Sequence, residues 1–302
     1  MILKLSEIFD FLYETNQKFI YYGNNELSIN GFCSLKNMRE KSITWIKKFD
    51  NYDISIIDKL LDLLIVTDNK CFEEAKINGY NVISCENPKE VFFSILTHFF
   101  QTSKKAKIEK NSTVLTDRIG NNVSIGYNCY ICKDVTIADN VLIKNNVVIE
   151  CETKIGLNST INSGVVIGTD GFGYYKNKDG SIFNVPHFGG VAIGKFVDIG
   201  ANTCIDRGTI DDTIIEDNVK IDNLCHIAHN VHIKENSYVI ALSMLGGSCL
   251  LEKNSYIAPG SLLMNQIAIG ENSMVGMGAV VTKDVEANKV VVGVPAKVIR
   301  DI

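Results

Sequence analysis

A mainly β fold, in which a parallel β-helix follows a small α/β domain, is what this sequence predicts. From Ile215 to Val281 every sixth residue is aliphatic, and an upstream run from Ile119 to Ile167 repeats isoleucine at the same spacing. A strand repeats every 2 residues and an α-helix every 3.6, so a strict period of six belongs to neither. It indicates a backbone that turns a corner every six residues and points one aliphatic side chain inward from each side. Three sides form one coil, and stacked coils form a solenoid.

The interior of such a coil has room for one large and one smaller side chain on each side. The residue two positions before each inward aliphatic is usually small or β-branched, as at Val123, Cys129 and Val135. Cys129 also forms a CxxC pair with Cys132, a spacing that can indicate metal or redox chemistry. The inward position of Cys129, and the lack of a second pair at metal-binding spacing, favour a packing role instead.

Composition limits the partners and the location that we expect. The 302-residue chain carries a net charge of −5, and its basic residues are scattered, so nothing predicts nucleic-acid binding. The segment Met1 to Leu12 has Glu7 and Asp10 within its apolar stretch, which does not fit a secretory signal. No apolar run reaches the roughly 18 residues of a membrane-spanning helix. With nine cysteines, an odd number, we expect a reduced, cytoplasmic protein.

Residues 1–100 lack the six-residue period and predict a separate α/β domain. Leu3 to Thr15 has the apolar stripe of an amphipathic helix, and Ile29 to Trp45 alternates short apolar runs with polar breaks, as a small mixed sheet would. Asp58 to Val66 reads as a buried strand or helix. Asn87 to Phe99 predicts a helix in which Asn87 is the cap and Pro88 occupies the first turn.

The β-helix domain is expected over residues 101–285, after a polar linker at Gln101 to Lys107, and a tail follows at 286–302. Two insertions interrupt the period. The first, Gly168 to Gly190, is too long for an ordinary turn, and long loops on rigid scaffolds are usually functional. The second lies around Arg207 to Asp212 and adds four residues between two inward isoleucines.

Histidines supply the clearest candidate for chemistry. His226, His229 and His232 lie close together, and His229 falls two residues past the inward Ile227, at a corner of the coil. A corner histidine is accessible to substrate and has an ordinary pKa near neutrality, as a general base requires. Binding of a metal by the three histidines is disfavoured because they point in different directions and lack carboxylates or cysteines at ligand spacing. A solvated turn histidine is the remaining alternative.

A solenoid of this kind cannot cover its flat faces and coil ends alone. We therefore expect a homotrimer, with clefts between subunits into which corners and loops project.

Five motifs in order along the chain resemble the LpxD family, N-acyltransferases of the lipid A pathway. These motifs are Asp170-Gly-Phe-Gly-Tyr174, Ile205-Asp-Arg-Gly208, Asp211-Asp-Thr-Ile-Ile215, Ile221-Asp-Asn223 and Ile227-Ala-His-Asn230. In the N-terminal part, Gly31-Phe-Cys-Ser-Leu35 and Ile43-Thr-Trp45 look like the uridine-binding module of that family. The resemblance implies a trimeric, left-handed β-helix that moves a 3-hydroxyacyl group onto the amine of a nucleotide-linked glucosamine. The general rule for β crossovers would have favoured the right-handed sense.

The resemblance also assigns residues. The catalytic histidine of the family falls on His229, and the oxyanion-binding backbone amide falls on Gly247. Trp45, the only tryptophan, falls where an aromatic ring stacks on the base, with Lys48 and Asn51 at neighbouring nucleotide-contacting positions. Lys48 and Asn51 differ in type from the family pattern, so the base need not be uracil.

Further substrate contacts are expected around the histidines. Asp206 and Asn223 are candidates to orient the sugar or the histidine, and Gln266 stands where the family has a second active-site histidine. The remaining substrate-binding candidates are Asp170, Phe172, Tyr174 and His226.

The C-terminal part departs from the LpxD pattern. Gly276-Met-Gly-Ala-Val-Val-Thr-Lys-Asp284 and Val292-Gly-Val-Pro-Ala-Lys-Val-Ile-Arg300 look like CoA-dependent hexapeptide acetyltransferases, and no room remains after Arg300 for the long helix that would meet acyl carrier protein. This second resemblance gives four residues a role in binding CoA. They are Gly276, Gly278, Lys283 and Lys297. Alternatively, the tail only caps the last coil.

The combined resemblance favours an acyltransferase that uses acyl-CoA as co-substrate, with no tightly bound cofactor. Its acceptor would be a nucleotide-linked amino sugar such as dTDP-4-amino-4,6-dideoxyglucose, and its acyl group short, such as 3-hydroxybutyryl. The anthrose-pathway acyltransferase, AntD, is of this type. The alternative is LpxD proper, a UDP-3-O-(3-hydroxyacyl)glucosamine N-acyltransferase that takes its acyl group from acyl carrier protein. A β-helix with a purely structural or binding role is a third interpretation, but it does not explain a corner histidine near a long aromatic and glycine-rich loop.

Overall fold

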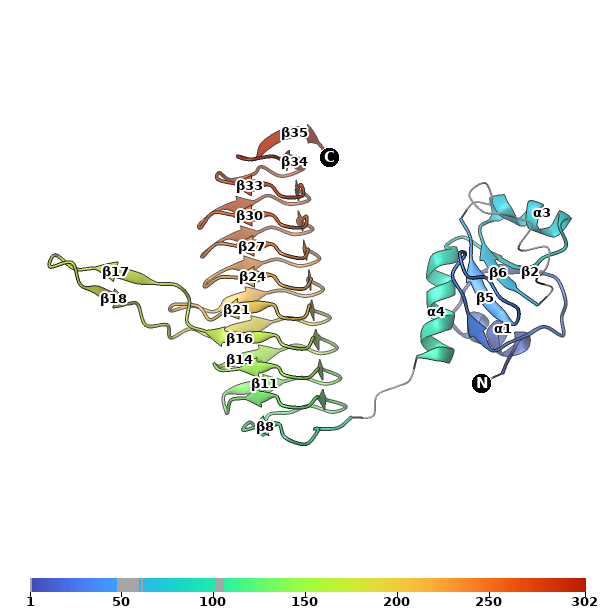
Figure 1. Ribbon diagram of the computed structural model, residues 1–302, viewed down its shortest axis with the longest axis horizontal. Helices are drawn as coiled ribbons and strands as arrows, with labels where there is room; N and C mark the ends of the chain where they lie inside the picture. The colour runs from blue at the N-terminus through green and yellow to red at the C-terminus, as the bar shows by residue number, and fades with distance from the viewer. Residues whose placement is uncertain (1, 48–59, 61, 102–105) are drawn as a thin grey trace. The chain divides into compact units, whose positions relative to one another are not determined.

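The computed structural model describes residues 2–47, 60, 62–101 and 106–302 (Figure 1). It divides the chain into two compact units, Met1–Ser103 and Lys104–Ile302, which we call the N-terminal unit and the β-helix unit. Among the described residues, no helix is long and apolar enough to cross a membrane.

The N-terminal unit is an α/β domain around a five-stranded sheet with the order β2-β7-β6-β5-β4. Only the β2–β7 pair is antiparallel. A separate antiparallel pair joins β1 to β3. The elements are β1 (Leu3–Lys4), α1 (Leu5–Glu14), β2 (Phe19–Tyr22), β3 (Ser28–Ile29), β4 (Gly31–Phe32), β5 (Ser42–Trp45), β6 (Leu64–Thr67), α3 (Asn69–Ile77), β7 (Asn81–Cys85) and α4 (Pro88–Phe100).

Alternation along the strands gives this sheet an apolar layer on each face. Leu64 and Val66 of β6 pack in one cluster with residues of α1 and α4, whereas Ile65 packs in a second cluster with residues of α3. Successive side chains of a strand point to opposite faces, so a strand that is buried throughout requires cover on both sides. The helices α1 and α4 therefore cover one face of the sheet and α3 the other.

The helices expected near Leu3 to Thr15 and Asn87 to Phe99 are confirmed as α1 and α4. Pro88 occupies the first turn of α4, where its missing N–H costs nothing. Asn87 occupies the N-cap position, as predicted, but its side chain accepts no hydrogen bond from the first turn of the helix.

The β-helix unit consists of three long parallel sheets, one for each side of the coil (Figure 1). The first contains β8 (Thr113–Val114), β10 (Tyr130–Ile131), β13 (Val148–Ile149), β16 (Val166–Thr169), β21 (Cys204–Asp206), β24 (His226–Ile227), β27 (Met244–Leu245), β30 (Leu262–Leu263) and β33 (Val280–Val281). The second contains β11 (Val135–Ile137), β14 (Thr153–Ile155), β19 (Val191–Ile193), β22 (Thr213–Ile215), β25 (His232–Ile233), β28 (Leu250–Leu251) and β31 (Ala268–Ile269). The third contains β9 (Ser124–Ile125), β12 (Leu142–Ile143), β15 (Thr160–Ile161), β20 (Asp198–Ile199), β23 (Lys220–Ile221), β26 (Tyr238–Val239), β29 (Tyr256–Ile257), β32 (Met274–Val275), β34 (Lys289–Val292) and β35 (Lys297–Asp301).

The six-residue period marks the interior of these coils, as predicted. Ile227, Leu251 and Ile257 are all 0 % exposed, and each continues a column of aliphatic side chains along its sheet. The smaller side chains two positions earlier are buried as well, and where they are serines their hydroxyls donate to backbone carbonyls, as Ser237 does to Glu252 O at 3.1 Å. A buried hydroxyl without such an acceptor would destabilise the core.

The corners use the left-handed backbone conformation, which asparagine tolerates better than most residues. Asn218, Asn236, Asn254 and Asn272 have φ between 58° and 60°. Their side chains also form a ladder from coil to coil, for example Asn218 Nδ2 to Asn236 Oδ1 at 2.8 Å. One residue type therefore supplies both the turn and the contact between neighbouring turns.

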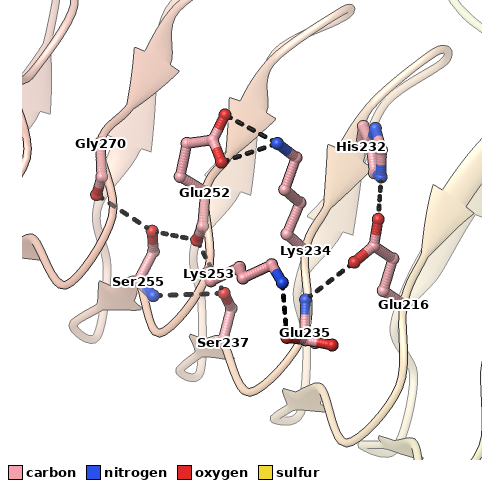
Figure 2. Close-up of polar contacts among 9 residues, drawn as sticks. All are labelled: Glu216, His232, Lys234, Glu235, Ser237, Glu252, Lys253, Ser255 and Gly270. Atoms are coloured by element: carbon pink, nitrogen blue, oxygen red, sulfur yellow. Dashed lines mark hydrogen bonds and ion pairs between the residues drawn. The ribbon is translucent and has the colours of Figure 1, made fainter.

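The outer surface of the coils adds paired charges (Figure 2). His232 Nε2 lies 2.7 Å from Glu216 Oε1, and Lys234 lies 2.7 Å from Glu252, each pair joining neighbouring coils. Exposed pairs of this kind contribute about 0–1 kcal/mol each, so the interior aliphatics determine most of the stability.

The first insertion forms an antiparallel hairpin, β17 (Tyr174–Lys176) and β18 (Ile182–Asn184), that projects away from the stack of coils (Figure 1). The tail closes the C-terminal end of the stack (Figure 1). There, β35 turns back against β34, and a side chain at Gly276 would meet Val292 Cγ1 at 2.5 Å. Gly276 thus makes room for the tail to pack on the last coil.

We expect Ile257→Val to lower the free energy of unfolding by about 0.5–1.5 kcal/mol, because it removes a methylene from a site with no solvent contact. Leu262→Val is the matched control. Leu262 points outward and is 40 % exposed, so its change should stay within about 0.5 kcal/mol. Urea unfolding of both variants measures the difference, and equal losses would contradict the inward assignment of the period.

Candidate active site

Two of the three candidate histidines, His226 and His229, lie close to the insertions, whereas His232 lies on the second sheet. His226 lies on β24, directly beside Cys204 of β21, and His229 follows at the corner two residues past the inward Ile227. The partner of His226 is Asp206, the last residue of β21. A register irregularity between β16 and β21 accompanies Asp206, which is only 5 % exposed.

The hydrogen bonds around His229 fix its tautomer. Asn230 Nδ2 donates to the Asp211 carbonyl oxygen at 3.2 Å, so the amide oxygen of Asn230 faces the other way, where it lies 3.0 Å from His229 Nδ1. The same oxygen accepts from the Thr209 hydroxyl at 2.8 Å. An amide oxygen only accepts hydrogen bonds, so Nδ1 carries the proton and Nε2 has a free lone pair. The second insertion thus orients the imidazole.

His229 Nε2 faces Gly247, one coil further along. A Cβ on Gly247 would lie 2.7 Å from Nε2 and 2.8 Å from Cε1 of His229, closer than packed atoms can approach. Glycine is therefore required here for the imidazole to occupy its position. Gly171, in the first insertion, is restricted in the same way, since its Cβ would lie 2.6 Å from His229 Cδ2.

The Asp206 carboxylate is held among polar groups beneath the histidines. Its Oδ1 accepts from the Thr169 hydroxyl at 3.2 Å, and its Oδ2 lies 3.6 Å from His226 Nε2. Burial raises the pKa of Asp206 above its ordinary value of 3.8, and the electrostatic interaction with His226 and the hydrogen bond from Thr169 partly oppose this rise. The site can therefore place a carboxyl group of altered acidity close to the base.

This raised pKa predicts a pH dependence of stability. Between pH 3.8 and the raised folded pKa, the folded protein binds more protons than the unfolded chain, so the free energy of unfolding should fall as pH rises and level off above that window. Asp206→Asn cannot titrate and should lose this slope. Thermal melts across this pH range provide the test, with Asp134→Asn as the exposed control. An unchanged slope in the Asp206 variant would refute the assignment.

His187 and Thr209 belong to this cluster, although sequence reasoning did not select them as site residues. The ring centroids of His187 and His229 are 5.4 Å apart, with an interplanar angle of 72°. Both residues come from the insertions, where the six-residue period gives no guidance. Pairing between the two insertions places them, through Phe188 N to Thr209 O at 2.8 Å and Gly189 N to Gly208 O at 3.0 Å.

Other predicted residues lie around this centre or apart from it. Asp170 is exposed, and Phe172 and Tyr174 are exposed on the first insertion with ring centroids 4.9 Å apart. Gln266 is exposed at the corner one coil beyond Gly247, where its backbone N–H donates to Gly247 O at 2.9 Å. Asn223 does not contact His229. Its Oδ1 accepts from Ala201 N at 2.6 Å at a different corner, and Asn230 Oδ1 is the amide oxygen that lies 3.0 Å from His229 Nδ1. The alternative role of Asn223, in orienting the sugar, stays a prediction.

The N-terminal unit contains a pocket of about 570 Å³ beside Trp45. Trp45 ends β5, and the pocket is closed by residues that lead into α4. Its lining is Trp45, Lys47, Asp68, Glu86, Asn87, Pro88, Lys89, Glu90 and Phe93. The predicted nucleotide contacts Lys48 and Asn51 lie outside the described residues.

The CoA-binding residues proposed from the tail are spread over the end of the β-helix unit. A Cβ added at Gly278 would have no atom within 4 Å among the described residues. Lys283 and Lys297 are exposed. At Gly276, by contrast, the side chain of Val292 occupies the space that a Cβ would need. The contact between Gly276 and Val292 agrees with the capping alternative for the tail.

Two stretches of the chain match known repeat families. Residues 118–151 match the bacterial transferase hexapeptide family (six repeats), and residues 245–283 match the hexapeptide repeat of succinyl-transferase. UDP-3-O-acylglucosamine N-acyltransferase 2 of Legionella pneumophila is 51 % identical over 94 residues, which are 31 % of this chain and 27 % of that protein. UDP-3-O-acylglucosamine N-acyltransferase of Acidovorax sp. is 52 % identical over 87 residues, 29 % of this chain and 26 % of that protein. The matched stretch thus spans about a quarter of the length of these relatives.

Among solved structures, LpxA from Acinetobacter baumannii is similar with a TM-score of 0.58 and 21 % identity, covering 64 % of this chain and 74 % of that one. This likeness confirms the left-handed parallel β-helix. The relatives also correct one prediction. They are named for acylation of a UDP-linked 3-O-acylglucosamine, so the interpretation as an AntD-like, acyl-CoA-dependent enzyme acting on a dTDP-linked 4-amino sugar is wrong.

Proposed function

We propose that this protein is an N-acyltransferase of the LpxD type, which moves an acyl group onto the amine of a UDP-linked 3-O-acylglucosamine. The observation that carries the proposal is His229, whose free Nε2 faces Gly247 while Asn230 holds Nδ1. This is the arrangement that a general base needs. The names of relatives that are about 50 % identical over the matched stretch support the acceptor.

The proposed reaction is attack of the sugar amine on a thioester. The nitrogen lone pair forms a bond to the thioester carbonyl carbon, and His229 Nε2 takes a proton from the amine. The resulting oxyanion accepts a hydrogen bond from the Gly247 N–H, a contribution of roughly 3 kcal/mol for one donor. Collapse of this intermediate breaks the carbon–sulfur bond, and the thiolate that leaves takes the proton from His229.

The pocket beside Trp45 is the proposed site for the nucleotide base. A flat indole at the edge of a pocket of about 570 Å³ can stack on a base, which contributes about 1–3 kcal/mol. Trp45→Ala should therefore raise KM for the nucleotide sugar about 10-fold or more and leave kcat nearly unchanged, because a remote contact stabilises ground state and transition state alike. Phe93→Ala, at the same pocket, is the comparison for simple loss of apolar lining. A fall in kcat with KM unchanged would contradict the assignment.

The donor in this proposal is the acyl thioester of acyl carrier protein, and the working assembly is a homotrimer. The exposed hairpin and its aromatic side chains support assembly, since a projecting apolar surface usually marks an interaction site. Sedimentation should give three times the chain mass of 33.5 kDa. A fully active monomer would exclude sites shared between subunits.

The direct test is acylation by the purified protein. We expect UDP-3-O-(3-hydroxyacyl)glucosamine and 3-hydroxyacyl acyl carrier protein to give an N-acylated product, detected by mass spectrometry. The same sugar nucleotide with its amine already acylated is the control and should not react. No product from the free amine with either the carrier-protein or the CoA thioester would overturn the proposed function.

A further inference from the structure

His187 is a buried group that the reaction as proposed does not use. It lies three residues past the end of β18 (Ile182–Asn184) and is 6 % exposed. Its Nδ1 lies 2.8 Å from the carbonyl oxygen of Val185. A carbonyl oxygen accepts hydrogen bonds and cannot donate, so Nδ1 carries the proton in the neutral ring. Nε2 is then a hydrogen-bond acceptor.

This acceptor has no partner among the described residues, and it is buried. A buried polar atom without a hydrogen bond is uncommon, because its lost hydration is not replaced. Such atoms are found where a ligand completes the hydrogen bonding or where function requires the imbalance. The missing partner of Nε2 must be a donor.

Nε2 of His187 faces the same small space as the catalytic imidazole. A Cβ on Gly171 would lie 3.0 Å from His187 Nε2 and 2.6 Å from His229 Cδ2, so one point lies next to both rings. Cδ2 is bonded to Nε2 of His229, the atom assigned as the base. The next atom of His229 is its own Cβ, at 2.9 Å from the same point, so the unpartnered acceptor faces the Cδ2 edge of the ring, one bond from the atom assigned as the base.

We propose that His187 Nε2 is the second hydrogen-bond acceptor for the amine of the substrate, which makes His187 a substrate-contacting residue. This inference rests on the proposed function. A primary amine has two N–H bonds and one lone pair. If His229 takes one proton and His187 accepts the other N–H, the lone pair has one remaining direction, toward the thioester carbonyl. Holding a nucleophile in this way supplies part of the catalytic effect of positioning.

Gly171 lies beside His187 Nε2, so an incoming amine would take the place of this glycine. The segment suits such a shift, because Gly168 and Gly173 lie on either side of Gly171 and glycine adopts backbone conformations that other residues avoid.

The test compares three substitutions that separate the two nitrogens of His187. His187→Gln can place an amide oxygen near the position of Nε2. His187→Asn can keep the hydrogen bond to Val185 O but does not reach the position of Nε2. His187→Phe keeps a ring for packing and removes both polar atoms. We expect the Asn and Phe variants to lose about 10- to 100-fold in kcat with little change in melting temperature, and the Gln variant to recover most of the loss.

A binding measurement keeps the test independent of turnover and of the behaviour of any one variant. The probe is the same nucleotide sugar with hydrogen in place of its 2-amino group. The unsubstituted protein should bind the amine about 10-fold more tightly than this probe, and His187→Phe should lose most of this preference, keeping only the part that His229 supplies. A residue that serves only packing would not change this preference.

The outcomes separate the two proposals. Normal kcat and unchanged amine preference in the Asn and Phe variants overturn the role of His187 alone. A loss of activity that follows the melting temperature equally in all three variants, with the amine preference kept, also overturns it. If the unsubstituted protein forms no product from the amine, the proposed function fails, and the role of His187 fails with it.

Discussion

His229→Ala should lower kcat by about 10²–10⁴-fold, the range that a general base contributes. The reason is local. Asn230 and Thr209 hold Nδ1 as the donor, so Nε2 is the only nitrogen of this ring that is free to take a proton. KM for the nucleotide sugar should stay within a few-fold, because the base does not contribute to ground-state binding of the nucleotide. Steady-state kinetics with the carrier-protein thioester measure both constants.

His232→Ala is the matched control for this substitution. His232 is only three residues along the chain, but it lies on a different sheet and pairs with Glu216 at 2.7 Å (Figure 2). Loss of that pair should cost about 0–1 kcal/mol of stability and leave turnover unchanged. His226→Ala should have an intermediate effect, since His226 contacts Asp206 but not Gly247. Near-normal turnover in His229→Ala would point instead to loss of the amine proton to solvent or to the substrate itself.

The regular coils could be predicted from the sequence because they depend on the spacing of residues that are close together in the chain. A side of six residues positions one inward residue, and the columns through Ile227 and Ile257 follow from that spacing alone. Asparagine, which tolerates the left-handed conformation, occupies many of the corners; this rule is local too, although it did not enter the prediction. The handedness of the β-helix could not be predicted in this way, because the same inward pattern fits either sense of winding. The left-handed sense was inferred from the family resemblance and then from the similar solved structure.

Only part of the candidate site could be predicted from the sequence. His229 and Asp206 lie within the periodic region, so the period predicts which way they point. His187 lies in an insertion without a period, and its position depends on hydrogen bonds from Phe188 and Gly189 to the second insertion. No local pattern encodes a contact between two irregular loops. Only the three-dimensional structure therefore shows that His187 lies close to His229.

The CoA-binding role predicted for Gly276 meets a physical alternative in the structure. Gly276 was interpreted as a glycine that lets a cofactor approach the backbone, and glycine does allow close approach. In the structure the group that approaches is Val292 of the same chain. At the end of a solenoid, the same residue types are used for packing of the cap and for binding of a ligand. The sequence motif alone therefore could not distinguish these two roles.

Gly247→Ala should lower kcat by about 10²-fold while the melting temperature changes little. The new Cβ would lie 2.7 Å from His229 Nε2, so the imidazole has to move away. A displacement of about 1 Å of a catalytic group can cost about 10²-fold. The backbone N–H of residue 247 remains in the variant, and its φ lies outside the left-handed region, so neither loss of the amide nor backbone strain explains the effect. His229 is partly exposed and can rotate without opening a cavity in the core.

Gly260→Asn is the control for replacing a glycine where a side chain has room. Gly260 also lies at a corner, with φ of 69°, and a Cβ added there would have no atom within 4 Å among the described residues. Asparagine tolerates that conformation at many other corners of this chain, so this variant should keep both its activity and its melting temperature. A crystal structure of Gly247→Ala should show His229 rotated away from residue 247. If instead Gly247→Ala retains full kcat with His229 in place, then the space beside Nε2 is not needed for catalysis. The base would then have to act from another direction, and the assignment of Gly247 to the oxyanion would fall with it.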